Sequence, residues 1–182
     1  MAEDLVVRFC SPTLAGIKAG SLFVCPFSDG ASLQRWLRGF NRRLGGKGLR
    51  VLSLRYRGGK ALIYVYRPRM LERDLLDHDA QRILTERGYL PGPVGHRLAQ
   101  LIRRLACSGE FPHEIGLFLG YPPEDVSGFI CGDKEYKCTG CWKVYGDVES
   151  ARLQFSAFKR CTEQYCSRFA HGCTLEELAV AG

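Results

Sequence analysis

Residues 50–66 read RVLSLRYRGGKALIYVY, two runs of strand-forming residues on either side of Gly58-Gly59. A two-residue Gly-Gly connection between such runs is typical of a β-hairpin, because both turn residues need positive φ angles that glycine adopts without strain. We therefore predict an antiparallel hairpin with strands over residues 50–56 and 61–66.

Helical patterns surround this hairpin. Before it, Leu33, Leu37 and Leu44 share one helical face, with Ser32 as the expected N-cap. After it, helices are predicted over residues 70–87, 94–106 and 111–120, and another short helix starts within residues 122–126. Further helices are predicted from Asp147 to Gly172 and from a capping box at Thr174. The predicted fold class is α+β, a small antiparallel sheet with several packed helices and a helix-rich C-terminal half.

The composition indicates one soluble globular domain over residues 1–182, since 46% of the chain is apolar and 25% is charged. No apolar run approaches the 18 or so residues that a membrane span needs. The chain begins MAED, which is acidic where a secretory signal is basic. We therefore expect a cytoplasmic protein that is neither exported nor inserted in a membrane.

Charge is distributed unevenly along the chain. Residues 1–105 hold 19 Lys and Arg against 8 Asp and Glu, whereas residues 106–182 hold 7 against 11. No acidic residue occurs between Asp29 and Glu72, a stretch that contains many arginines. Such a stretch would attract anions, although a run of arginines is often only a solvated face.

Cysteine follows the opposite trend, with seven of the nine cysteines after residue 106. Because their number is odd and no signal peptide is evident, reduced thiols, metal ligands or redox chemistry are better interpretations than a disulfide framework. Residues 137–142 read KCTGCW, which places Cys138 and Cys141 three residues apart. Two thiols at this spacing can bind one metal ion or close on each other, and a single pair is only half of a zinc or iron site.

Two further residues are candidates to complete such a site. Cys10 precedes Pro12, which could open a short helix whose dipole would lower the pKa of the thiol. His113 stands beside Glu114 at a predicted helix start, where a neutral imidazole could be a ligand or a proton carrier. The alternatives are an ordinary structural cysteine and a surface histidine. Our hypothesis for the catalytic or metal site is therefore Cys138, Cys141, Cys10 and His113.

Two motifs are set aside. Residues 45–48, GGKG, lack the spacing and the hydroxyl of a phosphate-binding loop. Residues 115–126 suggest a helix-turn-helix, but the second helix carries Glu124 and Asp125, which phosphates would repel. Nucleic acid is therefore a less favoured partner.

Three blocks, residues 10–18, 111–122 and 137–147, together resemble a bacterial family known only as domain of unknown function 3793. The family pattern often has His before the first cysteine, where Phe9 stands here. The resemblance implies a small cytoplasmic protein of anaerobic bacteria, linked to redox or iron metabolism through gene neighbourhoods that contain flavodoxins. It implies no established activity and no assigned catalytic residues.

Two functional hypotheses follow, and neither decides whether the protein is an enzyme. The first is a thiol-dependent redox or metal-binding protein, with zinc or iron as the metal and Cys138 and Cys141 as the active pair. The second is a non-catalytic binding module, whose Arg-rich helix and hairpin hold an acidic redox protein such as a flavodoxin, a phosphate-bearing cofactor or nucleic acid.

Overall fold

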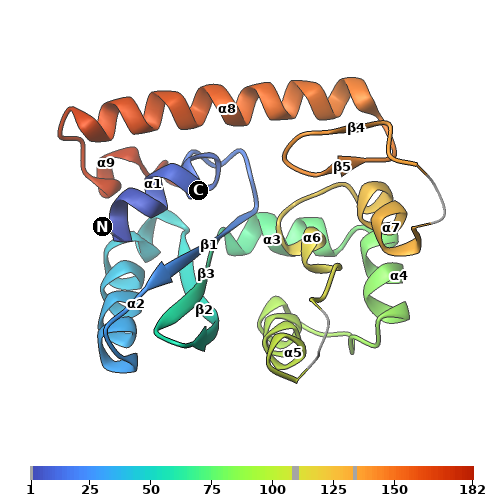
Figure 1. Cartoon of the computed structure of the whole chain (residues 1–182), viewed down its shortest axis with the longest axis horizontal. Helices are drawn as coiled ribbons and strands as arrows, with labels where there is room; N and C mark the ends of the chain where they lie inside the picture. Colours follow the sequence, from blue (N-terminus) through green and yellow to red (C-terminus); the bar gives the residue numbers. More distant parts are fainter. Residues whose placement is uncertain (1, 108–110, 133–134) are drawn as a thin grey trace. The chain divides into compact units, whose positions relative to one another are not determined.

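The computed structural model describes residues 2–107, 111–132 and 135–182, and these form two compact units. The first unit contains the chain up to Met70 together with Arg160–Gly182, and the second contains Leu71–Lys159. The α+β class and the helix-rich C-terminal half are confirmed (Figure 1). The single-domain organisation stays a prediction. No helix in the described ranges combines the length and hydropathy needed to cross a bilayer.

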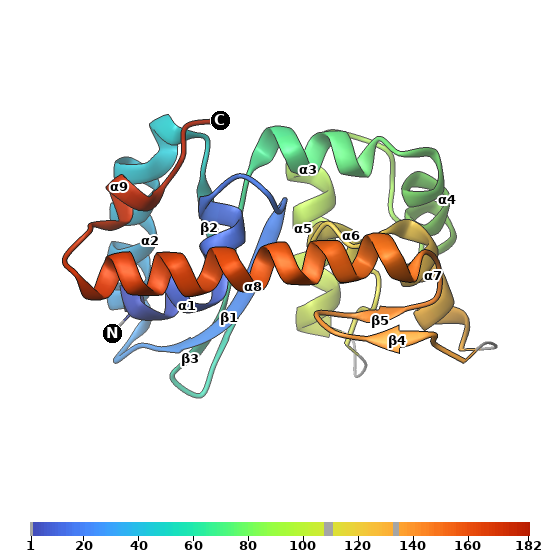
Figure 2. The same ribbon diagram turned by 90° about the horizontal axis from the view of Figure 1, so that it is seen from above.

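The first unit is built on a three-stranded antiparallel sheet (Figure 2). Strands β2 (Arg50–Arg57) and β3 (Lys60–Tyr66) form the predicted hairpin, and the φ angles of Gly58 and Gly59, 57° and 72°, confirm its tight turn. Strand β1 (Gly20–Pro26) pairs with the other edge of β3 and was not predicted. The strand order is therefore β1-β3-β2.

Helices cover one face of this sheet. They are α1 (Ala2–Leu14), α2 (Gly30–Leu44) with the 3₁₀ turn η1 (Gly45–Lys47), the C-terminal part of α8 (Val148–Ala170), and α9 (Leu175–Leu178). Alternate strand residues face them, because side chains along a strand point to opposite faces. The core below the helices contains Phe23, Cys25, Val51, Ala61, Ile63 and Val65 from the strands.

Some predicted helix boundaries were wrong. Asp29, not Ser32, is the N-cap of α2, and Ser32 is the third residue of its capping box. The helix predicted over residues 70–87 is two helices, α3 (Pro68–Leu75) and α4 (His78–Glu86), because the carboxylate of Asp77 caps α4 and stops the first helix from continuing.

The guanidinium of Arg67 is buried in the first unit, with the side chain only 4% exposed. Its Nε donates to the carbonyl of Thr13 at 2.7 Å, and its Nη2 donates to the carbonyls of Leu14 and Val180, both at 2.7 Å. Burial lowers the pKa of Arg67, because removal from water disfavours the charged form. The carbonyls therefore compensate a charge that water no longer reaches.

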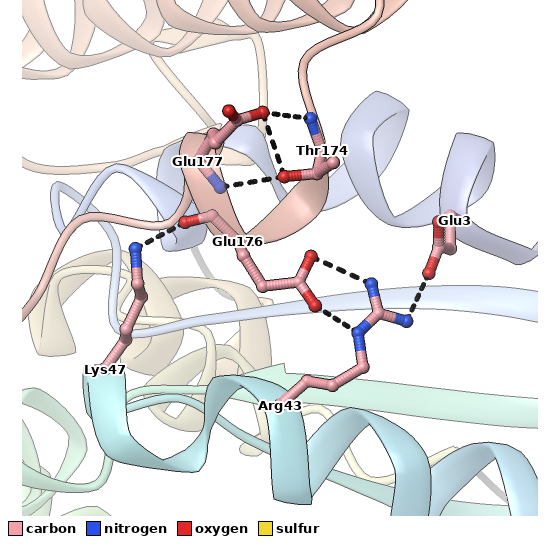
Figure 3. Close-up of polar contacts among 6 residues, drawn as sticks. All are labelled: Glu3, Arg43, Lys47, Thr174, Glu176 and Glu177. Atoms are coloured by element: carbon pink, nitrogen blue, oxygen red, sulfur yellow. Dashed lines mark hydrogen bonds and ion pairs between the residues drawn. The ribbon is translucent and has the colours of Figure 1, made fainter.

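A second set of basic contacts holds α9 against α2 and α1 (Figure 3). Arg43 on α2 forms a bidentate ion pair with Glu176 and donates to Glu3 of α1 at 2.6 Å. Lys47 donates to the carbonyls of Glu176 and Ala179, the latter at 2.9 Å. Arg43 and Lys47, which belong to the basic segment, therefore form contacts within the protein.

The second unit is helical apart from one short hairpin. It contains most of α3, then α4, α5 (Val94–Cys107), α6 (Ile115–Phe118), α7 (Pro123–Cys131), strands β4 (Cys138–Thr139) and β5 (Lys143–Val144), and the start of α8. The helix predicted over residues 111–120 is only the four residues of α6, whereas α7 begins at Pro123, within the predicted start. A Cβ on Gly116 would lie 2.8 Å from Val126, so glycine allows α6 to pack closely on α7.

We predict that Arg67→Ala lowers the free energy of unfolding by about 3 to 5 kcal/mol, because buried carbonyls lose their donors and a cavity forms. Urea unfolding followed by circular dichroism measures this change. Arg69→Ala, at an exposed position two residues away, is the matched control and should change stability by less than about 0.5 kcal/mol. Equal effects of the two substitutions would contradict the assignment of Arg67 as a structural residue.

Candidate functional site

The CTGC segment forms the hairpin of β4 and β5 in the second unit. Cys138 pairs with Val144 across the hairpin, and Cys141 lies in the loop between the strands. Gly140 lies against the ring of Phe155 on α8, so that a Cβ at this position would overlap the ring. The glycine between the two cysteines is therefore required by lack of space.

Asp125 on α7 attaches this hairpin to the helix. Its carboxylate is buried, with the residue 4% exposed, and accepts three hydrogen bonds. The donors are the indole Nε1 of Trp142 at 2.6 Å and the backbone N–H groups of Tyr145 and Gly146 at 2.7 and 2.8 Å. Because both carboxylate oxygens are used in this way, Asp125 positions the hairpin and presents no unpartnered charge.

Aromatic packing fixes the loop that follows Cys141. The ring of Trp142 stacks on Tyr121, with centroids 4.7 Å apart, and meets the ring of Phe155 edge-on at 4.5 Å. Trp142 is also part of a small core with Val144 and Ala151. The loop is thereby held between α7 and the start of α8.

A pocket of about 400 Å³ lies beside the hairpin loop, within the second unit. Its lining is mostly apolar, with four aromatic rings and a few polar groups, as small-molecule sites usually have. The residues that line it are Phe111, His113, Ile115, Gly116, Tyr121, Asp125, Val126, Phe129, Thr139, Gly140, Cys141, Trp142 and Lys143.

The two hairpin cysteines lie in different surroundings. Cys138 is half-buried and packs against the small core that contains Trp142 and Val144. Cys141 is exposed and lines the pocket. Solvent and a pocket ligand therefore reach Cys141 more readily than Cys138.

Tyr121 joins the wall of the pocket to the cysteine loop. Its hydroxyl donates to the carbonyl of Cys141 at 3.4 Å. Burial raises the pKa of Tyr121 to about 12, with a smaller contribution from the thiol of Cys141. Tyr121 is consequently neutral and a hydrogen-bond donor at physiological pH.

His113 lines the same pocket as Cys141, so the structure brings these two predicted residues together. The imidazole is exposed and meets the ring of Phe129 edge-on, with centroids 4.9 Å apart. Its sequence neighbour Glu114 is instead buried, accepts a hydrogen bond from Tyr89 at 3.1 Å and lies near Arg104. Glu114 therefore is not part of the pocket.

The predicted environment of Cys10 was wrong. Pro12 does not open a helix but lies inside α1, which begins at Ala2, and Cys10 belongs to the buried face that includes Val6 and Leu14. Because that apolar face continues past Pro12, the helix does so as well. Cys10 is completely buried, and burial raises the pKa of its thiol instead of lowering it. It belongs to the first unit, whereas the other three candidates belong to the second.

No cluster of three or more His, Cys, Asp or Glu side chains suited to a metal ion occurs within residues 2–107, 111–132 and 135–182. Zinc or iron binding stays a prediction.

Sequence reasoning missed several residues of the pocket. Asp125 looks in the sequence like an ordinary acidic residue in the first turn of a helix, where such residues are common. Tyr121 and Phe129 look like core aromatics, and Lys143 like a solvated strand residue. Their only shared signal is the density of aromatic residues between Phe111 and Trp142.

The sequence model of a family described as protein of unknown function (DUF3793) matches residues 6–179. The chain therefore belongs to this family, as the three sequence blocks predict. No curated protein and no solved structure matches the chain.

We predict that Asp125→Asn lowers the free energy of unfolding by about 2 kcal/mol, because one amide oxygen cannot replace a carboxylate that accepts from three N–H groups. Urea unfolding measures the loss, and the NMR signal of the Trp142 indole N–H should move towards that of a solvent-exposed indole. Asp79→Asn, at an exposed carboxylate, is the control and should leave the indole signal in place. An unchanged indole signal in the Asp125 variant would contradict this role.

Proposed function

We propose that the protein is a thiol-dependent redox protein in which Cys141 attacks the substrate and Cys138 completes the reaction. The observation that carries this proposal is the exposure of Cys141 in a pocket, with a less exposed thiol three residues away on the same hairpin. An accessible attacking thiol and a protected second thiol are the arrangement that thiol–disulfide exchange needs. Membership of the family adds no activity to this argument.

The chemistry proceeds in two exchanges. The thiolate of Cys141 attacks one sulfur of a substrate disulfide, forming a mixed disulfide and releasing the other sulfur as a thiolate that takes a proton from water. The thiolate of Cys138 then attacks the sulfur of Cys141 and releases the second substrate thiol. The substrate gains two electrons and two protons, and the protein is left with a Cys138–Cys141 disulfide.

Other groups have supporting roles in the proposal. His113 is the base in the same pocket and accepts the proton of the Cys141 thiol. In the reducing cytoplasm that the sequence predicts, a cellular dithiol reduces the Cys138–Cys141 disulfide and resets the pair. Cys10 has no part in the reaction, because its buried thiol disfavours the thiolate.

The first test counts free thiols by mass spectrometry after alkylation. Mild oxidation with diamide should remove two thiols reversibly from the wild-type protein. It should remove none from the double variant that carries both Cys138→Ser and Cys141→Ser. Cys131→Ser, at another exposed cysteine of the same unit, is the matched control and should behave as wild type. In the presence of a small disulfide, Cys138→Ser alone should accumulate a mixed disulfide at Cys141.

Loss of two thiols from the double variant as well, or loss of none from the wild-type protein, would contradict the redox proposal. Elemental analysis of protein purified without oxygen tests the metal version of the hypothesis. About one zinc or iron ion per chain, lost in the double variant, would show that the two cysteines bind a metal ion and would contradict the redox pair.

A second candidate function is electrostatic binding of an acidic protein by the first unit. That unit has a net charge of +9, from 15 Lys and Arg against 6 Asp and Glu, whereas the second unit has 11 against 13, or −2. Arg35, Arg38 and Arg42 are exposed and lie on one face of α2, which we name the α2 arginine stripe. Within the described part of the chain, Arg38 and Arg42 form no ion pair, unlike Arg43.

This candidate commits to an acidic polypeptide, such as a flavodoxin, because repeated carboxylates match the spacing of exposed arginines. A phosphate-bearing cofactor or nucleic acid would be a different outcome of the same measurement.

We predict that binding of poly-L-glutamate weakens steeply as salt rises, and that alanine at all three positions of the α2 arginine stripe weakens it about tenfold at low salt. Fluorescence anisotropy of labelled polymer measures both effects. Arg152→Ala, at an exposed arginine of the second unit, is the control. Binding that is insensitive to salt, or preferred binding of an equally charged oligonucleotide, would contradict an acidic-protein partner.

A further inference from the structure

The pocket beside the hairpin has an aromatic rim that remains exposed to solvent. Phe111 is 45% exposed and Phe129 is 40% exposed, and both line the pocket. Tyr136, next to Lys143, is 48% exposed. Two exposed rings therefore line the pocket and a third lies beside its lysine, and each of them leaves apolar area in water.

The inner wall of the pocket is also aromatic. Tyr121 and Trp142 form a stacked pair whose planes differ by 28°, and Trp142 is itself held by Phe155 and by the carboxylate of Asp125. Trp142 is held between two rings, and it holds Tyr121 in place by stacking. The rings of Tyr121 and Phe129, which line the same pocket, suit a flat, conjugated ligand, which stacks on aromatic faces with little loss of entropy.

Lys143 is the lysine among the described residues that line the pocket. The ammonium of Lys143 lies over two rings, 5.4 Å from the centroid of Phe129 and 4.9 Å from that of Tyr136. Within the described ranges, it forms no ion pair. Among the lining residues that the structure describes, Asp125 contributes the one carboxylate, which already accepts three hydrogen bonds. Lys143 is exposed, whereas the carboxylate of Asp125 is buried and held by its donors, so Lys143 is the charged group that can meet an anion in this pocket.

We propose that this pocket binds a small planar aromatic compound that carries an anionic group, with the ring system among Phe129, Tyr121 and Trp142 and the anion on Lys143. A volume of about 400 Å³ accommodates a molecule of one to three fused rings. The inference rests on the pocket of the proposed function and names its ligand class. It does not rest on the thiol chemistry itself, and the ring would lie beside Cys141.

The test uses two probes of nearly the same shape, 2-naphthoate and the neutral 2-naphthalenemethanol. Isothermal titration calorimetry should show that the wild-type protein binds the anion at least about tenfold more tightly than the alcohol. In a Trp36→Phe variant, Trp142 is the single tryptophan of the chain, so its indole N–H signal in NMR reports occupation of this pocket. That signal should shift with naphthoate.

Substitutions separate the two parts of the proposal. Lys143→Gln should remove the preference for the anion and leave binding of the alcohol unchanged, whereas Phe129→Ala should weaken both probes. Arg152→Gln, which removes an exposed charge elsewhere in the unit, should change neither affinity. The unchanged indole signal of each unliganded variant shows that the pocket has folded.

The Cys138→Ser variant keeps the outcomes distinct, because Cys138 does not line the pocket. It should bind naphthoate as the wild type does, even though it has no redox pair. Absence of binding by the wild type, equal affinity for the two probes, or an anion preference that survives Lys143→Gln would overturn the ligand proposal, whatever the thiols do. Reversible oxidation of the thiols would then still support the redox function.

Discussion

The buried guanidinium of Arg67 is the interaction on which the first unit depends. A charged group removed from water is stable only where other dipoles replace the lost hydrogen bonds. The carbonyls of Thr13, Leu14 and Val180 do so, and they come from the end of α1 and from the segment after α9. Arg67 itself follows β3 directly. One side chain therefore holds the sheet, the first helix and the C-terminal segment in register.

The second unit also contains a buried charged group, of the opposite sign. Asp125 is as deeply buried as Arg67, and it accepts from N–H groups where Arg67 donates to carbonyls. The hairpin that Asp125 holds contains the two cysteines, and Cys141 and Trp142 of this hairpin line the pocket. Positioning by a buried carboxylate leaves Cys141 in an exposed loop on a rigid base, which is what a reactive or ligand-binding loop requires.

The sequence predicted those elements that are stabilised by residues close together in the chain. The Gly58-Gly59 turn and the helix over Val94–Cys107 were found, because a turn needs its glycines and an amphipathic helix shows its period. Strand β1 was missed, since its stability comes from pairing with β3, whose sequence lies 40 residues later. Cys10 was misplaced for a similar reason, because a proline looked like a helix start and only the buried face of α1 shows otherwise.

The sequence by itself determined the α+β class, the family, the charge asymmetry and the spacing of Cys138 and Cys141 on one short segment. These depend on residue type and on spacing within a few turns or strand residues. Only the tertiary structure decided that His113 and Cys141 line one pocket, that Lys143 faces two rings, and that Cys10 is buried in the other unit. Such relations are set by packing between distant segments and by the need to pair buried charges, which no local pattern records.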